Sequence, residues 1–476
     1  MIVSTGKQIF DQSNWQEQVY IVLLHLFTDG RIYFRCTKPR TILLPDHTLK
    51  KILLCLLLYS ITATLPAQTT YLHCGRLLTM QNARLQTAVT LVVEGDKIIR
   101  IEPGYTVPPT GAEVIDLKNK TVLPGLIDCH VHLEWEQNRN SYTEKYVLNE
   151  ADVAFRSVVY AQRTLLAGFT TVRDLGGQGV NLALRNAINA GLVSGPRILT
   201  AGRALSITGG HGDPTNGAKW DLFDPPGPEM GIADGLDECR AAVRNQVKRG
   251  ADCIKVCATG GVLSLARDGR LPHYAQDELA IIVSTARDLG IPVAAHAHGD
   301  EGIRRAVLAG VVSIEHGTFM SDSTMELMKQ RGTWYVPTLT AGWAVSDSAR
   351  LAKGFFPEVV RIKALDIGPK IQATLVRAHQ QGVKIAFGTD AGVFPHGRNN
   401  LEFGHMANAG MASAAILRSA TLDAATMLRM SDRIGSLETG KFADIIAVEG
   451  NPLDDIRAME KVVFVMKGGR VFKEIN

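Results

Sequence analysis

Short apolar segments alternate with longer amphipathic stretches through the middle of this 476-residue chain. An apolar run followed by a helical pattern is typical of a βα unit, whose strands pair in parallel. Eight such units favour closure of the sheet into a (β/α)8 TIM barrel, within the α/β class. An open doubly wound sheet is the alternative, but its usual Gly-rich phosphate fingerprint is absent from the sequence. The eight runs are residues 126–132, 170–174, 197–201, 253–258, 292–298, 312–317, 334–338 and 384–390.

Both ends of the chain, by contrast, have the pattern of β-strands joined by tight turns. Residues 90–100 predict a hairpin around Gly95 and Asp96. The runs 443–448 and 462–466 are apolar, and a turn at Gly468 and Gly469 follows them. We therefore predict a small β-sandwich domain made from residues 69–122 and 430–476, with a barrel of residues 123–429 between the two segments.

The N-terminal region predicts export. Lys50 and Lys51 precede the apolar run 52–65 and the small residue Ala67, a pattern typical of a secretory signal peptide. The run is shorter than the roughly 20 apolar residues of a spanning helix, so we expect no stable membrane span. An uncleaved anchor or a buried helix is the alternative. Because signal peptides stand first in a chain, we interpret residues 1–48 as a non-native upstream extension and residues 49–68 as the signal peptide. The mature protein would then be periplasmic or extracellular.

The charge of the chain bears on nucleic-acid binding, and the spacing of its cysteines bears on disulfide bonds. The first 68 residues contain seven Lys/Arg and four Asp/Glu, which is +3 of the net charge of +4 and leaves about +1 for the rest. Such a chain lacks the basic field that recruits nucleic acid, so we expect no nucleic-acid partner. Five of the seven cysteines follow residue 68, and their irregular spacing favours free, buried thiols over a disulfide framework.

Imidazole and carboxylate side chains occur at the carboxyl ends of four predicted strands, which is where TIM barrels have their active sites. Residues two apart on a strand point to the same side, so both imidazoles of a His-x-His pair face the barrel mouth. Histidine and carboxylate ligands that converge from separate strands are what zinc or a similar ion requires. A core role could explain any one of them, but four strand ends together favour a metal site. The residues are His130, His132, His296, His298, His316 and Asp390.

Lys255 lies in the middle of the apolar run 253–257. A buried lysine is costly unless its charge is matched or removed. It could be a structural lysine paired with Asp390 or another carboxylate. Alternatively, its neutral amine reacts with carbon dioxide, and the carbamate bridges two metal ions. Cys257 shares the same face as a rival ligand, although we expect it to be a buried thiol.

These segments resemble the amidohydrolase superfamily. The matching segments are residues 123–132, 254–256, 296, 316–317, 388–390 and 434–446, and the resemblance runs from about Leu72 to the C-terminus. It implies two divalent ions, with zinc expected. One ion would be held by His130, His132 and Asp390, and the other by His296 and His316, with carboxylated Lys255 between them. Strand parity leaves His296 and His298 equivalent, and the family's spacing to His316 assigns the ligand to His296.

The implied activity is metal-dependent hydrolysis of a carbon–nitrogen bond. Asp390 and His298 are the predicted catalytic residues: Asp390 accepts the proton of the attacking water and passes it to the leaving nitrogen, while His298 supports the site or faces the substrate. Retention of Lys255 and Asp390 argues against a catalytically inactive binding module.

The loops after the predicted strands resemble the superfamily branch that contains Xaa-Pro and Xaa-Arg dipeptidases and an ochratoxin amidase. We therefore expect a small-molecule substrate, either a dipeptide or an N-acyl amino acid with a free carboxylate. The alternatives are a cyclic amide such as an imidazolone-like ring, and a xenobiotic ester or organophosphate. Arg173, His211 and Tyr274 are the predicted substrate-binding residues, although Arg173 could instead pair with Asp174, and Tyr274 could be the apolar start of a helix. A homo-oligomer is compatible with the sequence.

Overall fold

The computed structural model describes residues 69–81, 84–219, 221–266, 268–351 and 353–475. The predicted extension of residues 1–48 and the predicted signal peptide of residues 49–68 lie outside these ranges. The chain divides into two units, Met1–Ala67 and Gln68–Asn476, and the structure below is that of the second. Among the described helices, none has the length and apolar character needed to cross a membrane.

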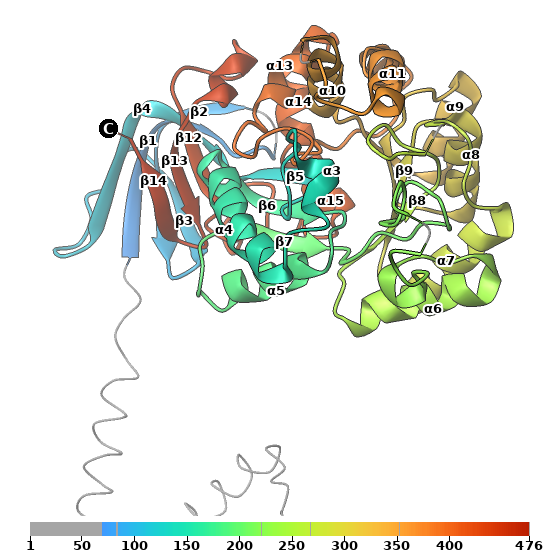
Figure 1. The fold of residues 1–476 in the computed structure, drawn as a ribbon. Helices are drawn as coiled ribbons and strands as arrows, with labels where there is room; N and C mark the ends of the chain where they lie inside the picture. The colour runs from blue at the N-terminus through green and yellow to red at the C-terminus, as the bar shows by residue number, and fades with distance from the viewer. Residues whose placement is uncertain (1–68, 82–83, 220, 267, 352, 476) are drawn as a thin grey trace, which may run out of the picture. The chain divides into compact units, whose positions relative to one another are not determined.

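Strands from both ends of the described chain form one sheet, shown in blue and red in Figure 1. The strand order is β14-β13-β12-β4-β1-β2-β3, in which β1 and β4 are parallel and the other pairs are antiparallel. The predicted two-sheet sandwich is not confirmed, because all seven strands pair edge to edge in a single sheet. Their bounds are β1 Thr69–Leu78, β2 Leu85–Glu94, β3 Lys97–Pro103, β4 Glu113–Pro124, β12 Ile445–Val448, β13 Val462–Lys467 and β14 Arg470–Glu474.

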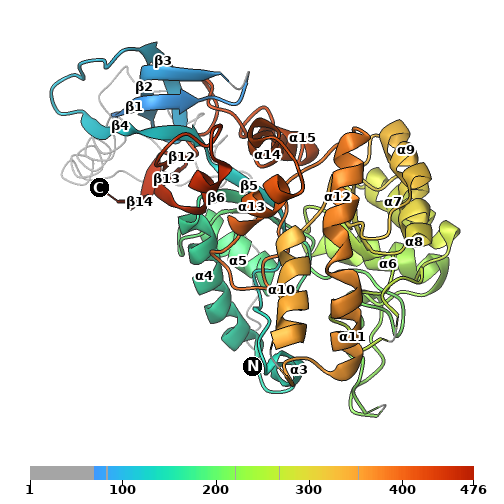
Figure 2. The same cartoon turned by 90° about the horizontal axis from the view of Figure 1, so that it is seen from above.

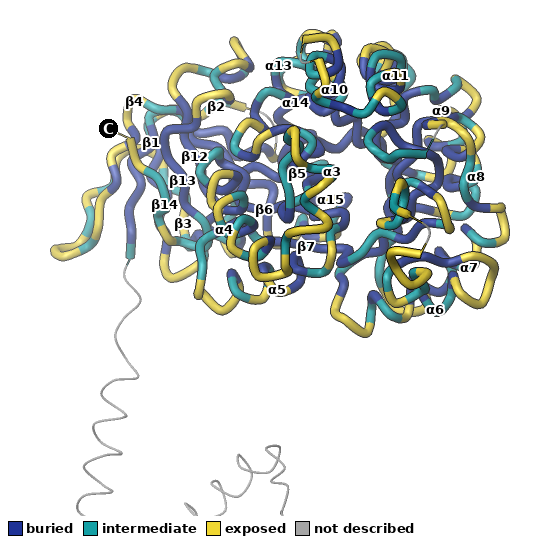
Figure 3. The backbone as a smooth tube through the Cα atoms, viewed as in Figure 1, coloured by how far each residue is buried: buried dark blue, intermediate teal, exposed yellow. Residues whose placement is uncertain are grey.

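Two parallel sheets make up the middle of the chain, and their strands fall at the first seven predicted runs. The three-stranded sheet has the order β5-β6-β7 and the four-stranded sheet the order β11-β10-β9-β8. Nearly every residue of these strands is buried, as is typical of parallel sheets covered on both faces (Figure 3). The bounds are β5 Leu126–Val131, β6 Phe169–Asp174, β7 Arg197–Thr200, β8 Ile254–Cys257, β9 Val293–Ala297, β10 Ser313–His316 and β11 Trp334–Val336.

The eighth predicted strand, residues 384–390, is not a strand in the structure. Single parallel bridges join Ile385 to Tyr335 and Ala391 to Val131, so the run lies between β11 and β5. Within this run the Asp128 carboxylate accepts hydrogen bonds from both the backbone N–H and the hydroxyl of Thr389. A further bridge, from Leu205 to Val256, links the segment after β7 to β8. The structure therefore has two parallel sheets joined by bridges, and a closed eight-stranded barrel is not shown.

Helices follow most of the parallel strands, and consecutive ones such as α6, α7, α8 and α9 pack side by side (Figures 1 and 2). Local sequence explains the ends of α9: the Ser321 hydroxyl accepts the N–H of Thr324, and Gly332 ends the helix with φ 71°. The helix bounds are α3 Ser141–Glu144, α4 Glu150–Leu166, α5 Val180–Asn189, α6 Gly235–Lys248, α7 Gln276–Asp288, α8 Asp300–Ala309, α9 Asp322–Arg331, α10 Leu339–Leu351, α11 Glu358–Ile367, α12 Lys370–Gln380, α13 Leu401–Asn408, α14 Ser413–Ser419 and α15 Leu422–Met427, with short 3-10 turns at Pro228–Met230 and Ile456–Glu460.

Candidate metal centre and active site

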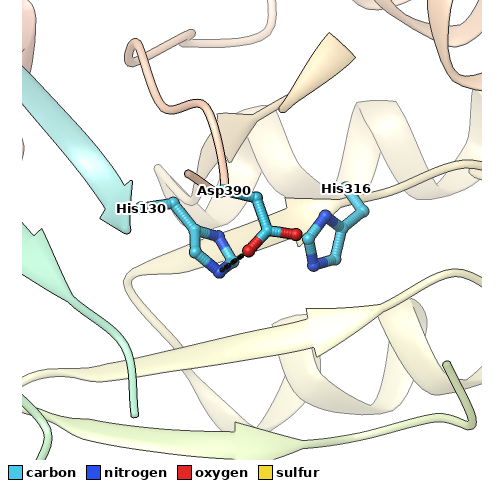
Figure 4. A group of neighbouring side chains, drawn as sticks. All are labelled: His130, His316 and Asp390. Carbon is cyan, nitrogen blue, oxygen red and sulfur yellow. Dashed lines mark ion pairs between the residues drawn. The ribbon is translucent and has the colours of Figure 1, made fainter. Parts of the chain in front are cut away.

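His130, His316 and Asp390 lie together at the carboxyl ends of the parallel strands. Their ligand atoms are all within 4.8 Å of one another, and all three residues are buried. Figure 4 shows the Asp390 carboxylate between the two imidazole rings. His130 comes from β5, His316 from β10 and Asp390 from the end of the eighth predicted run, residues 384–390. Three segments far apart in the sequence thus supply ligands of the type that zinc binds.

Asp390 also faces His132. Its Oδ1 lies 3.4 Å from His130 Nε2 and 3.3 Å from His132 Nε2. Although this oxygen is buried, it accepts no well-formed hydrogen bond from any described residue. A buried acceptor without a donor is costly, and a bound cation would satisfy it. The arrangement of the two imidazoles and the carboxylate therefore fits a metal ion.

The far side of each of these imidazoles is held by an acceptor. His130 Nδ1 lies 2.9 Å from Glu315 Oε2, and His132 Nδ1 lies 2.6 Å from the carbonyl oxygen of Gly176. Since both partners only accept, each Nδ1 donates and each Nε2 lies on the side of Asp390, which is the usual arrangement of metal-binding histidines. Burial lowers the pKa of His130 to about 4, so the ring is neutral at pH 7.

Two further histidines, His296 and His298, stand beside His316 of this cluster. The ring centroid of His316 is 4.8 Å from that of His296 and 5.1 Å from that of His298. Each ring has one nitrogen anchored: His296 Nε2 to the Gly260 carbonyl, His298 Nδ1 to Thr318 and His316 Nδ1 to Thr338. The opposite nitrogens make no hydrogen bond to a described residue. Burial lowers the pKa of all three rings, that of His298 to about 3, so all are neutral potential ligands.

Lys255 reaches this group from β8. Its Nζ is 3.4 Å from His130 Nε2, and the residue is only 3% exposed. Within the described part of the chain it forms no ion pair with Asp390 or any other carboxylate, so the predicted structural pairing is not seen. Burial is the largest effect on its pKa and lowers it, which favours the neutral amine. The nearby Cys257 thiol has a pKa raised by burial to about 11 and remains protonated, as expected of a buried thiol.

Backbone strain is concentrated at this site. His316, Thr338 and Asp390 have φ values of 70°, 56° and 60°, in the left-handed region that costs a non-glycine residue about 1 kcal/mol or more. The strain is fixed by hydrogen bonds from the Asp390 N–H to the His130 carbonyl and from the Tyr335 hydroxyl to the His316 carbonyl. Such strain is common where side chains must be aimed at a ligand.

Sequence reasoning assigned no role to two buried acids that support the ligands. Glu315 binds His130 and Arg173; burial would raise its pKa, but these two partners lower it to about 2. Asp128 accepts from His130 N, Thr389 and Asn399, and burial raises its pKa to about 6. An ionisable residue in an apolar strand is costly to bury without a partner. The reasoning that identified Lys255 could therefore have identified Asp128 and Glu315 as well.

All seven predicted metal-site and catalytic residues line one cavity of about 380 Å³: His130, His132, Lys255, His296, His298, His316 and Asp390. Much of the remaining wall is apolar, including Trp135, Met230, Val262, Val345, Ile367 and Ile371. Among the predicted substrate residues, His211 also lines the cavity and stacks on His296, with ring centroids 4.3 Å apart.

The other two predicted substrate residues lie elsewhere. Tyr274 is 1% exposed, belongs to the apolar core and does not line the cavity. Arg173 is also absent from the lining; its guanidinium donates to Cys129 O, Ser313 Oγ and Glu315 Oε1. It does not pair with Asp174, the alternative partner predicted from the sequence. Its geometry corrects the substrate assignment: Arg173 positions Glu315, and through it His130.

The comparisons with known proteins agree with this geometry. The profile described as "Amidohydrolase family" matches residues 121–472. Ochratoxinase from Aspergillus niger is 33% identical over 437 residues, covering 87% of this chain and 88% of the relative. A crystal structure of a Xaa-Pro dipeptidase with bound methionine in its active site is 45% identical, with a TM-score of 0.83, and covers 85% of this chain and 100% of its own. The structure of a prolidase complexed with N-methylphosphonate-L-proline is 33% identical, with a TM-score of 0.79, and covers 86% of this chain and 100% of its own. The chain therefore belongs to the amidohydrolase family, as its sequence predicted, and is a hydrolase that acts on carbon–nitrogen bonds of a small-molecule substrate.

Proposed function

We propose that this protein is a binuclear metal-dependent hydrolase that cleaves the amide bond of dipeptides or N-acyl amino acids. The observation on which the proposal rests is Lys255, a buried amine 3.4 Å from His130 Nε2 without a carboxylate partner among the described residues. We further propose that the two parallel sheets are parts of one (β/α)8 barrel. The bridges at Leu205, Ile385 and Ala391, which join the sheet edges, support this.

The residues present fit two ions. His130, His132 and Asp390 would hold one, and His296 and His316 the other. The neutral Nζ of Lys255 would add to the carbon of carbon dioxide and release one proton to solvent, giving a carbamate anion whose two oxygens serve both ions. When bound, the ions, which we propose to be zinc, polarise the scissile carbonyl and lower the pKa of a water molecule toward neutrality.

The protein's own groups then move the proton. The pKa of Asp390 is lowered despite its burial, so the carboxylate is ionised at neutral pH. Its Oδ1, which is buried and accepts no well-formed hydrogen bond from a described residue, can accept the proton of the attacking water and return it to the leaving nitrogen. His298, anchored through Nδ1 to Thr318, presents Nε2 to the cavity and can hydrogen-bond the substrate carbonyl.

The relatives and the cavity wall support the choice of substrate. A Xaa-Pro dipeptidase and a prolidase are among the similar structures. The apolar side chains Val345, Ile367 and Ile371 offer a surface for an aliphatic side chain or a proline ring. His211, stacked on His296 with a neutral ring, remains a proposed substrate contact. We also propose that the protein is exported, on the strength of the N-terminal sequence pattern.

A metal-reconstituted substrate screen tests the proposal. Protein stripped by a chelator and reloaded with zinc, manganese or cobalt is offered a library of dipeptides and N-acyl amino acids, with elemental analysis of each preparation. We expect two ions per chain and the fastest turnover on Xaa-Pro substrates. Turnover of ring amides alone, or protein that binds no ion, would overturn it.

A pair of variants isolates the role of Lys255. Lys255→Ala should lose bound metal and activity, and a short carboxylic acid added to the buffer should restore part of both. Cys257→Ala is the matched control, because Cys257 lies on the same strand and lines the same cavity. Equal metal content in the two variants would contradict the proposed carbamate.

A further inference from the structure

Arg203 is a cation in the wall of the active-site cavity that the roles above do not use. It follows β7 and lines the same cavity as the candidate metal ligands. Its guanidinium makes no hydrogen bond or ion pair with any described residue, and its Nε is buried without a partner. A guanidinium has five N–H donors and stays charged at all ordinary pH values. Because a buried donor without an acceptor is costly, this side chain is suited to an acceptor that arrives with a ligand.

The backbone that carries Arg203 is held in place. The Arg203 N–H donates to Gln246 Oε1 at 3.1 Å, and the Gly202 carbonyl accepts from Gly177 N and Asn181 Nδ2 at 2.9 and 3.0 Å. Gly202 has φ 66°, and a Cβ there would stand 2.9 Å from Gln246 Oε1. The backbone from which the Arg203 side chain projects is therefore held in place.

No described residue forms an ion pair with Arg203. Of the residues that line the cavity, Asp390 is the single acid, and it faces His130 and His132. The nearby Glu134 is occupied by the backbone N–H groups of residues 178, 179 and 181. Burial, followed by the neighbouring Arg249, lowers the pKa of Arg203, although the charges of Glu134 and Glu150 act in the opposite direction.

We propose that Arg203 binds the free carboxylate of the substrate, donating two N–H groups to its two oxygens, and so selects acids over the corresponding amides and esters. The planar guanidinium matches a carboxylate in shape and charge. This inference rests on the proposed function and deepens it, because it names the group of the substrate that the cavity recognises. Arg203 then determines specificity, while the bond-breaking groups are those already described.

The test pairs a change in the enzyme with a change in the substrate. The value of kcat/KM is measured for a Xaa-Pro dipeptide and for its C-terminal amide with the native protein, Arg203→Met, Arg203→Lys and Arg249→Met. The native protein should prefer the acid by about 10- to 100-fold, which is typical of a charge-assisted hydrogen bond, mainly through KM. Arg203→Met should reduce the preference to about one, and Arg203→Lys should keep part of it, since the charge remains without the planar donors.

Arg249→Met is the matched control, because Arg249 is an exposed neighbouring cation that does not line the cavity. It should leave the acid preference unchanged. The proposal is overturned if Arg203→Met keeps the native preference, or if Arg249→Met reduces it equally, which would indicate a long-range field effect.

Direct binding separates this inference from the proposed function. If the native protein hydrolyses neither dipeptides nor N-acyl amino acids, the proposed function fails. The binding affinities of the zinc-loaded protein for L-proline and L-prolinamide, measured by calorimetry, then test the role of Arg203 separately. Tighter binding of the acid that disappears in Arg203→Met supports the carboxylate site, and equal binding of the two ligands overturns it.

Discussion

Replacing Arg173 by methionine would test how the buried carboxylate of Glu315 is stabilised. The two side chains are 3% and 0% exposed and form an ion pair of 2.8 Å. Burial would raise the pKa of Glu315, but Arg173 and His130 outweigh it and lower the pKa from 4.5 to about 2. At about 1.36 kcal/mol per unit, the ionised form is favoured by roughly 3 kcal/mol. Arg173→Met keeps much of the aliphatic length but leaves the carboxylate without the cation. Since His130 also contributes to the lowered pKa, we take the expected loss at pH 7 from other broken buried pairs, which is roughly 3–5 kcal/mol.

The assay is urea denaturation in the presence of a chelator, so that metal binding does not contribute. In the native protein the lowered pKa gives stability that is fully present above pH 4.5 and is lost as pH falls toward 2. In Arg173→Met, burial should raise the pKa of Glu315, so the difference between the two proteins should shrink between pH 7 and about 5. The double variant Arg173→Met/Glu315→Gln is the matched control and should recover most of the loss, because no charge remains buried. A loss under about 1 kcal/mol at pH 7, or a double variant no more stable than the single one, would refute the reasoning.

Three further outcomes are expected. Asp390→Asn, in protein shown to contain metal, should lower kcat by about 10²- to 10⁴-fold, and undiminished turnover would contradict the proton-transfer role. Tyr274→Phe should leave kcat/KM unchanged and the free energy of unfolding equal or slightly higher, because the hydroxyl is buried without a partner among the described residues. A large rise in KM would instead support the predicted contact with the substrate. Metal-free protein should lose stability as pH falls from 6.5, because the unfolded chain then binds protons that the buried native rings do not. The loss should continue toward the folded pKa values of His130 and His298, about 4 and about 3. Urea denaturation measures it, and a stability that does not change with pH would argue against the burial of these rings in the neutral form.

The periodicity of the sequence predicted seven parallel strands closely, since apolar runs between helical patterns have few other ways to be buried. It did not predict that residues 384–390 would form isolated bridges instead of a strand. Their composition is strand-like, but the Asp128 carboxylate takes the hydrogen bonds of Thr389, and Asp390 adopts φ 60°. Alternation at the two chain ends likewise indicated strands without showing that all seven would join one sheet.

The spacing of residues along the chain determined which reactive side chains could lie on the same face of a strand. His130 and His132 are two apart on one strand, so the chain itself directs both rings to one side. Tertiary structure decided everything that depends on contacts between distant residues. It paired Arg173 with Glu315, 142 positions away, in place of the adjacent Asp174, and it buried Tyr274 in the core. It also left the Arg203 guanidinium unpaired among the described residues. The physical reason is that a side chain's chemistry is local, whereas its partner and its solvent exposure are set by whichever segments the fold brings beside it.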